Sequence, residues 1–219
     1  MEATGVIEGY HETRLGFDPK RDRVWKALWR YYFRRIVPAD GCVLDLGCGY
    51  GDFINNVAAR RRIALDLWPG FEAHLAPGVE AIRGSATDLS PIGDDSIDFA
   101  FASNLFEHVT QGDLAQSLEQ LKTKLTDRGT LTILQPNYRY AAREYFDDYT
   151  HISIWSHVSL ADFLAAHGWE VIECRPRFLP LTVKSRLPVW QPLIGLYLKL
   201  PFKPLGKQML LRARPKAGH

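Results

Sequence analysis

The chain has 219 residues, 46% of them hydrophobic and 24% charged, a net charge of +2, and three cysteines without C-x-x-C spacing. This composition excludes a disordered chain, a bundle of membrane-spanning helices, a disulfide framework and a zinc knuckle. With an N-terminus that lacks a signal sequence, it predicts a cytoplasmic protein of one domain over residues 1–219. The charge is uneven, because residues 174–219 hold ten Lys or Arg and no Asp or Glu.

Strand and helix patterns alternate along the chain. Asp18 and Pro19 open an amphipathic helix over residues 18–36, which belongs to an N-terminal helical cap over residues 1–40. Further helices are predicted over residues 52–60, 113–125 and 159–167, and strands over residues 42–46, 62–67, 79–84, 96–104, 129–136, 169–176 and 207–215. Such alternation is typical of an α/β fold in which a mostly parallel, seven-stranded sheet has helices on both faces.

Two long segments interrupt the alternation, residues 137–157 after the fifth strand and residues 178–206 before the seventh. Long connections in a compact domain are usually functional. The first is dense in aromatic and ionisable side chains and is interpreted as a substrate lid. The second is a basic, apolar insertion broken by five prolines.

The stretch VLDLGCGYGDF, residues 43–53, places three glycines at alternate positions directly behind a buried strand. Glycines without Cβ atoms let backbone amides and a helix start approach a ligand closely. The next strand ends at Asp66, where a carboxylate can accept hydrogen bonds from both hydroxyls of a ribose. This pattern predicts a nucleoside-containing cofactor at the turn.

Two common phosphate-binding motifs do not fit this turn. A dinucleotide fingerprint has the spacing G-x-G-x-x-G, and a P-loop needs a G-K-[ST] that the sequence lacks. Asp45 before the turn and Asp52 after it would also repel a pyrophosphate, whereas they could attract the cationic end of an amino acid.

The same stretch resembles motif I of the class I S-adenosylmethionine (SAM)-dependent methyltransferases. ALDL at 64–67, GSATDLSP at 84–91 and DDSIDFAFASNLFEHV at 94–109 follow in the order and spacing of that family's next motifs. The resemblance covers roughly residues 40–175. It implies a Rossmann-like fold whose seventh strand runs antiparallel to the rest, and SAM as the cofactor.

The resemblance also implies which residues hold the cofactor. The glycine turn and the end of the fourth strand would line the methionine part, Asp66 would bind the ribose, and Asp88 would meet the adenine. The implied contacts are Asp45, Gly47, Cys48, Gly49, Asp66, Leu67, Asp88, Leu89, Asn104 and Leu105. Asp66 and Asp88 have an alternative interpretation as turn and helix-capping acids, and Cys48 is expected as a small filler rather than a nucleophile.

A hydroxyl acceptor is helped by a general base above the strand ends, whereas an amine needs none. His151 is the favoured base, with Asp147 or Asp148 fixing its tautomer, although helix capping is an alternative for the two acids. His108, in NLFEHV, is a second candidate that could instead only shape the pocket. A metal set of Asp147, Asp148, His151 and His157 lacks a firm ligand pattern, so no metal is expected.

Substrate contacts are predicted from the N-terminal segment and the lid, at Tyr10, Arg14, Tyr138, Tyr140, Arg143 and Tyr149. The insertion cannot span a bilayer, but short apolar helices flanked by cations can lie on an anionic membrane surface. A lid extension or a dimer contact is the alternative. Nucleic acid is not expected, because no nucleic-acid module appears.

Small methyltransferases with this combination of lid and tail resemble those that accompany bacterial surface-glycan or lipid-linked saccharide biosynthesis. The resemblance implies O-methylation of a sugar, a glycolipid or another small acceptor. The alternatives are N-methylation of a small amine and a non-catalytic, SAM-binding partner of a membrane-associated assembly.

Overall fold

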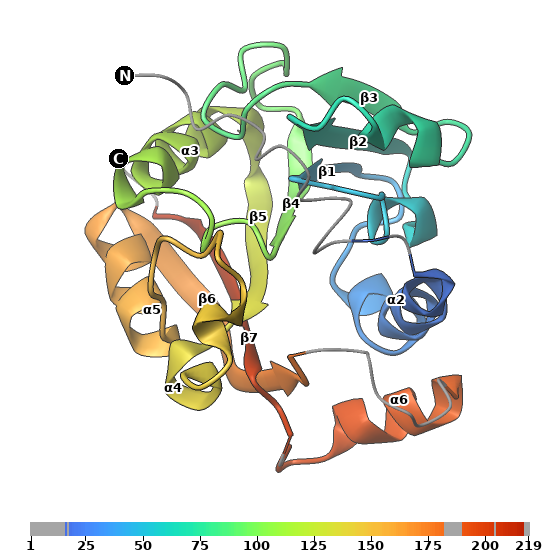
Figure 1. The fold of residues 1–219 in the computed structure, drawn as a ribbon. Helices are drawn as coiled ribbons and strands as arrows, with labels where there is room; N and C mark the ends of the chain where they lie inside the picture. The colour runs from blue at the N-terminus through green and yellow to red at the C-terminus, as the bar shows by residue number, and fades with distance from the viewer. Residues whose placement is uncertain (1–15, 17, 182–189, 204, 217–219) are drawn as a thin grey trace.

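The fold is built on one sheet of seven strands in the order β3-β2-β1-β4-β5-β7-β6 (Figure 1). The structure is a computed structural model that describes residues 16, 18–181, 190–203 and 205–216. The strands are β1 Cys42–Leu46, β2 Arg61–Asp66, β3 Glu80–Arg83, β4 Ile97–Ser103, β5 Leu125–Pro136, β6 Trp169–Leu179 and β7 Gln208–Pro215. Neighbours from β3 to β5 pair in parallel, and β7 is antiparallel to both β5 and β6. The predicted sheet is confirmed, including its antiparallel last strand.

Helices cover both faces of this sheet, as predicted. The α-helices are α2 Pro19–Tyr31, α3 Gln111–Lys124, α4 Tyr138–Ala141, α5 His157–Ala166 and α6 Gln191–Lys199. Figure 1 shows α3 and α5 on one side of the sheet and α2 and α6 on the other. Side-chain caps fix where α2, α3 and α5 begin. The Asp18 carboxylate accepts from the Lys20 N–H, and Thr110 and Ser156 form capping boxes.

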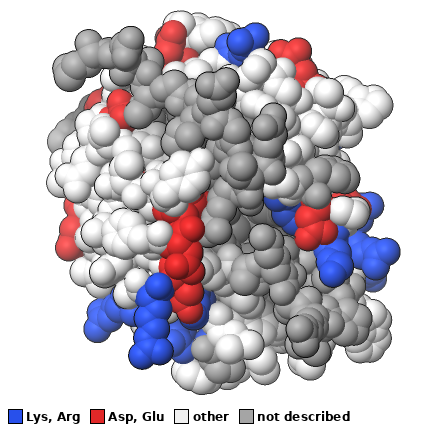
Figure 2. Space-filling view, viewed as in Figure 1, with Lys and Arg blue, Asp and Glu red and all other residues white. Residues whose placement is uncertain are grey.

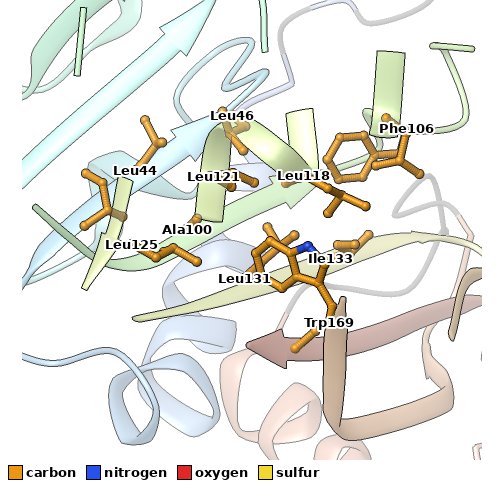
Figure 3. Close-up of a cluster of buried hydrophobic side chains, with 14 of the residues drawn as sticks. Leu44, Leu46, Ala100, Phe106, Leu118, Leu121, Leu125, Leu131, Ile133 and Trp169 are labelled. Atoms are coloured by element: carbon orange, nitrogen blue, oxygen red, sulfur yellow. The ribbon is translucent and has the colours of Figure 1, made fainter. Parts of the chain in front are cut away.

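Each face of the sheet packs into its own apolar cluster. On the α3 and α5 side, Leu44 and Leu46 of β1 meet Leu118 and Leu121 of α3, and Trp169 closes the cluster (Figure 3). All five residues of β1 are buried, which explains its uninterrupted apolar run. The two clusters hold the central strands rigidly, so their carboxyl ends can position a site.

The helix predicted over residues 52–60 is wrong. Only a 3-10 turn, Ile54–Asn56, follows the glycine turn. The Asn55 side chain donates to the His74 carbonyl at 2.8 Å and accepts from the Ala76 N–H at 2.7 Å, and the Asn56 side chain donates to the Asp52 carbonyl. The Asn55 side chain is thus held by backbone groups 19 and 21 residues away, and the Asn56 side chain makes a local backbone bond of the kind that competes with regular helix formation. The glycine turn therefore opens into one short turn rather than a full helix.

The insertion before β7 folds back onto the N-terminal helix. Gly195 of α6 lies against Tyr31 of α2 so closely that a Cβ atom there would be 2.9 Å from the Tyr31 ring. Leu198 is buried in the apolar cluster that α2 covers. In the described part of the chain, no helix has the length and apolar character needed to cross a bilayer. Residues 182–189 of the insertion, and the predicted substrate contacts Tyr10 and Arg14, lie outside the described residues.

Candidate active site

The carboxyl ends of β1, β2 and β4 open into a cavity of about 320 Å³. In the sheet, β1 lies between β2 and β4, so the strand order changes direction at β1. α/β sheets bind ligands at such a switch point. Eight predicted cofactor contacts line the cavity: Asp45, Gly47, Cys48, Gly49, Asp66, Leu67, Asn104 and Leu105. The sequence motifs from three separate strands therefore meet in one place.

The glycine turn owes its shape to backbone conformations that other residues rarely adopt. Gly47 has φ +65°, and a Cβ atom at this position would lie 2.8 Å from Leu105 Cδ1. The N–H groups of Gly47 and Cys48 both donate to the Leu65 carbonyl, at 2.8 and 3.2 Å. The turn is thus tied to β2 on one side and packed against the segment after β4 on the other.

Asp66 anchors the edge of the cavity where β2 ends. One carboxylate oxygen accepts from the Gly49 N–H at 2.7 Å and the other from the Trp68 N–H at 2.8 Å. Each carboxylate oxygen has a further lone pair, so the group can accept hydrogen bonds from a ligand as well.

The floor of the cavity favours a positively charged ligand group. Asp45 is 2% exposed, and burial raises its pKa well above the ordinary range, with the charges of Asp66 and Asp52 adding to the effect. A buried carboxylate without a counter-charge is costly. A cationic group entering the cavity would supply that charge.

Arg21 of α2 also lines the cavity, although the sequence analysis did not single it out. Its Nε lies 2.9 Å from Asp52 Oδ2, and its guanidinium lies over the Tyr50 ring at 5.1 Å. Within the described ranges, Nη2 has no hydrogen-bond partner. The sequence could have pointed to Arg21 through its spacing, because it lies three residues before Val24 and seven before Leu28, both on the buried face of α2.

Asp88 and Leu89, the other two predicted cofactor contacts, are not among the described residues that line the cavity. Asp88 is exposed and accepts from the Ser90 N–H, which is turn chemistry, and Leu89 is buried in the core cluster of the α3 side. The residues just before them line the cavity instead: Ser85, Ala86 and Thr87.

Three ionisable side chains meet beside the cavity: Glu107, His108 and His151. The rings of His108 and His151 lie 4.8 Å apart, and His108 lines the cavity together with Thr150. The sequence predicted both histidines but missed Glu107, which NLFEHV contains directly before His108. The convergence depends on the lid, which brings His151 back to the end of β4.

Hydrogen bonds fix the orientation of both imidazole rings. The Thr150 hydroxyl donates to Asp148 at 2.6 Å, so it accepts the His108 Nδ1–H at 2.8 Å. His151 Nδ1 lies 2.5 Å from the Tyr145 carbonyl and donates to it. Each ring therefore carries its lone pair on Nε2. Asp148 orients His108 through Thr150, whereas the sequence predicted an acid that orients His151.

Glu107 is fully buried, and neither of its carboxylate oxygens has a hydrogen-bond partner among the described residues. Burial raises its pKa to about 8, and the charge of Asp148 adds to the effect. Burial lowers the pKa of His108 to about 4, as does the nearby His151. The cavity wall therefore presents a neutral imidazole at neutral pH.

The remaining predicted lid residues either face solvent or contact other residues of the lid. Asp147, Arg143 and Tyr149 are exposed. Tyr138 packs edge-on against Tyr145, and Tyr140 stacks on His157, whose Nδ1 lies 2.9 Å from Asn137 Nδ2. None of these five predicted residues is among the described residues that line the cavity.

A family model described as a methyltransferase domain matches residues 17–174, most of the chain. The chain belongs to this methyltransferase family. No curated protein matches the sequence. The predicted class of enzyme is thus confirmed, and the cavity at the carboxyl ends of β1, β2 and β4 is the candidate active site of a methyltransferase.

Solved structures resemble this methyltransferase at low sequence identity. One is the complex between the Haloferax volcanii Trm112 methyltransferase activator and a methyltransferase, with 20% identity, TM-score 0.66, and coverage of 90% of this chain and 92% of that one. Another is a SAM-dependent methyltransferase from Archaeoglobus fulgidus, with 18% identity, TM-score 0.66, and coverage of 93% and 97%. A third is DhpI in complex with SAH, with 19% identity, TM-score 0.59, and coverage of 95% and 90%. These likenesses support the fold.

Proposed function

We propose that the protein transfers the methyl group of SAM to a hydroxyl of a small polar acceptor, either a sugar or the sugar headgroup of a glycolipid. The observation that carries the proposal is that His108, whose Nδ1 is bonded to the Thr150 hydroxyl, lines the same cavity as the glycine turn and Asp66. A donor site and a proton acceptor therefore share one space, as transfer to a hydroxyl requires.

Residues of this chain suit the separate parts of the donor. Asp66 would accept hydrogen bonds from the ribose hydroxyls, and Asp45 would attract the amino group. The free Nη2 of Arg21 would pair with the carboxylate. SAM, when bound, supplies a methyl group on a positively charged sulfur. The DhpI structure in complex with SAH, the demethylated product, has a similar fold and supports this choice of cofactor.

His108 is proposed to receive the proton of the acceptor hydroxyl on Nε2. Thr150 and Asp148 are positioning residues, because they hold Nδ1 and so direct Nε2. His151 is not among the described residues that line the cavity, and its Nδ1–H donates to the Tyr145 carbonyl. Asp147, which is exposed, has no part in this proposal.

An amphiphilic acceptor would also suit the outer surface of α6. Its large exposed apolar residues, with their continuation toward β7, are Trp190, Leu193, Leu196, Leu200, Phe202 and Leu205. Leu196 is 58% and Phe202 is 66% exposed. In Figure 2, blue Lys and Arg side chains lie on the side of the molecule where Figure 1 places α2. We propose that this face contacts an anionic membrane, where a glycolipid would be presented.

Methyl transfer with labelled SAM and a panel of sugars, sugar lipids and amines tests the function. A product methylated on a sugar oxygen is expected, with loss of turnover but unchanged SAH affinity in His108→Ala. An amine product made equally well by His108→Ala would favour N-methylation. SAH binding without turnover on any acceptor would favour a non-catalytic partner, a role for which the activator complex of the Haloferax volcanii neighbour offers weak support.

A further inference from the structure

Glu107, His108 and His151 form a cluster whose potential ligand atoms face one another. Glu107 Oε1 lies 4.0 Å from Nε2 of His108 and 4.0 Å from Nε2 of His151. All three atoms lie within 4.8 Å of one another. Two imidazoles and one carboxylate are a donor set that binds first-row transition metals.

The surroundings of the two histidines match those of metal ligands. A metal-binding imidazole typically donates its other ring N–H to a carbonyl, a carboxylate or water, which fixes the tautomer. His151 donates Nδ1–H to the Tyr145 carbonyl, and His108 donates to Thr150, which in turn donates to Asp148. These bonds place the N–H of each ring on Nδ1, and each Nε2 lies 4.0 Å from Glu107 Oε1.

Glu107 supplies an independent observation. Its side chain is 0% exposed, and neither carboxylate oxygen has a hydrogen-bond partner among the described residues. Burying such a group without hydrogen bonds costs roughly 1–3 kcal/mol, and more if it is ionised. A cation held by the carboxylate would remove this cost.

We propose that Glu107 Oε1, His108 Nε2 and His151 Nε2 together bind one divalent transition-metal ion beside the cavity. The two imidazoles favour Zn²⁺, Co²⁺ or Ni²⁺ over Mg²⁺ and Ca²⁺, which prefer oxygen ligands. Bonds of about 2.1 Å place neighbouring ligand atoms roughly 3 Å apart, so the side chains would have to close by about 1 Å on binding.

This inference rests on the proposed function and changes one part of it. Three protein ligands leave a coordination position open, as in catalytic metal sites. His108 and Thr150 line the cavity, so that position would face the acceptor. Nε2 of His108 would then hold the ion instead of receiving the proton. The bound ion would supply Lewis acidity that lowers the pKa of a coordinated acceptor hydroxyl, and the released proton would pass to water.

The test uses the full chain, stripped with EDTA and titrated calorimetrically with ZnCl₂, with CoCl₂ absorption as a second readout. We expect one ion per chain and a higher melting temperature with metal. Glu107→Gln should weaken Zn²⁺ binding by at least about 100-fold, and Thr150→Val, which alters an outer-shell partner, by about 10–100-fold. Melting curves without metal would show whether each variant folds.

His167→Gln is the matched control, because it removes an imidazole at the end of α5 that bonds the Phe163 carbonyl. It should bind Zn²⁺ as the wild type does. Equal affinity in the wild type and Glu107→Gln, or no binding in either, would overturn the metal site. SAH titrations of the same samples separate the two proposals: SAH binding without a metal site removes only this inference, whereas absence of SAH binding removes the proposed function.

Discussion

The carboxylate of Asp66 accepts the backbone N–H of Gly49 at 2.7 Å, across the corner between β2 and the glycine turn. This hydrogen bond joins the end of one strand to the loop that follows its neighbour. A charged acceptor strengthens such a bond, so the turn and the carboxylate hold each other in place before any ligand arrives.

Asp66→Asn should lower the affinity for SAH by about 10–100-fold. The amide offers one acceptor oxygen in place of two, and hydrogen bonds to charged groups contribute about 1.5–3 kcal/mol. Isothermal titration calorimetry measures the change. Asp88→Asn is the control, because Asp88 is an exposed turn residue bonded to the Ser90 N–H. A loss in Asp88→Asn as large as that in Asp66→Asn would show that Asp88 contacts the donor.

Gly47→Ala should destabilise the protein by at least about 1–2 kcal/mol, since a left-handed conformation costs other residues this much. The added Cβ would also meet Leu105 Cδ1 at 2.8 Å. Urea unfolding followed by circular dichroism measures the loss. Gly93→Ala, where a Cβ would meet nothing closer than 3.8 Å, should change stability little. Equal midpoints for the two variants would contradict a strained, closely packed turn.

Arg21→Gln should weaken SAH binding about tenfold by removing a partner of the donor's carboxylate. The same variant should bind 5′-methylthioadenosine with nearly unchanged affinity, because that ligand has no carboxylate. Arg23→Gln, an exposed arginine on the same helix, is the control. If Arg21→Gln weakens both ligands equally, the arginine acts on the pocket as a whole and not on the carboxylate.

Asp45→Asn should be more stable than the wild type at neutral pH. Burial raises the folded-state pKa of Asp45 well above its ordinary value of 3.8. The folded protein therefore holds this proton more tightly than the unfolded chain, and wild-type stability falls as pH rises from about 4 through the raised pKa. The advantage of the variant should disappear below about pH 4.

Urea unfolding across this pH range measures the effect in Asp45→Asn, and calorimetry should show weaker SAH binding, because the amide lacks a charge for the amino group. A stability difference independent of pH would mean that the Asp45 carboxyl titrates alike in both states.

Leu196→Glu should reduce binding to vesicles that contain phosphatidylglycerol by about tenfold or more. Burial of one leucine contributes about 1.5–3 kcal/mol. Co-sedimentation with vesicles gives the partition coefficient. Ile172→Glu, at an exposed isoleucine of β6, should leave binding unchanged. Absence of wild-type binding, or the same loss in both variants, would remove the proposed membrane contact.

The strands β1, β2 and β4 could be predicted from the sequence because each is a short, largely apolar run that stops at a Gly, Asp or Asn. The glycine turn and Asp66 could be placed together because carboxyl ends of parallel strands share an edge. The short 3-10 turn after the glycine turn could not be predicted, since Asn55 bonds to the backbone of His74 and Ala76, which are distant along the chain. A helical pattern carries no trace of such competition.

The cluster around Glu107 was also beyond the sequence. Glu107 and His108 are adjacent in the chain, but their partner His151 arrives through the fold of the lid. Likewise, only the small size of Gly195 hints that α6 lies on Tyr31. Such tertiary contacts depend on where distant segments return, which periodicity does not encode.

The position of β7 between β5 and β6 has a consequence for synthesis of the protein. β6 leaves the ribosome before its neighbour β7, so it has no sheet partner while the parallel part from β1 to β5 can already form. A nascent chain halted before β7 would expose the unpaired edges of β5 and β6. Chaperones and proteases would meet the protein in that state, so pairing of β7 with both strands is the step that closes the sheet.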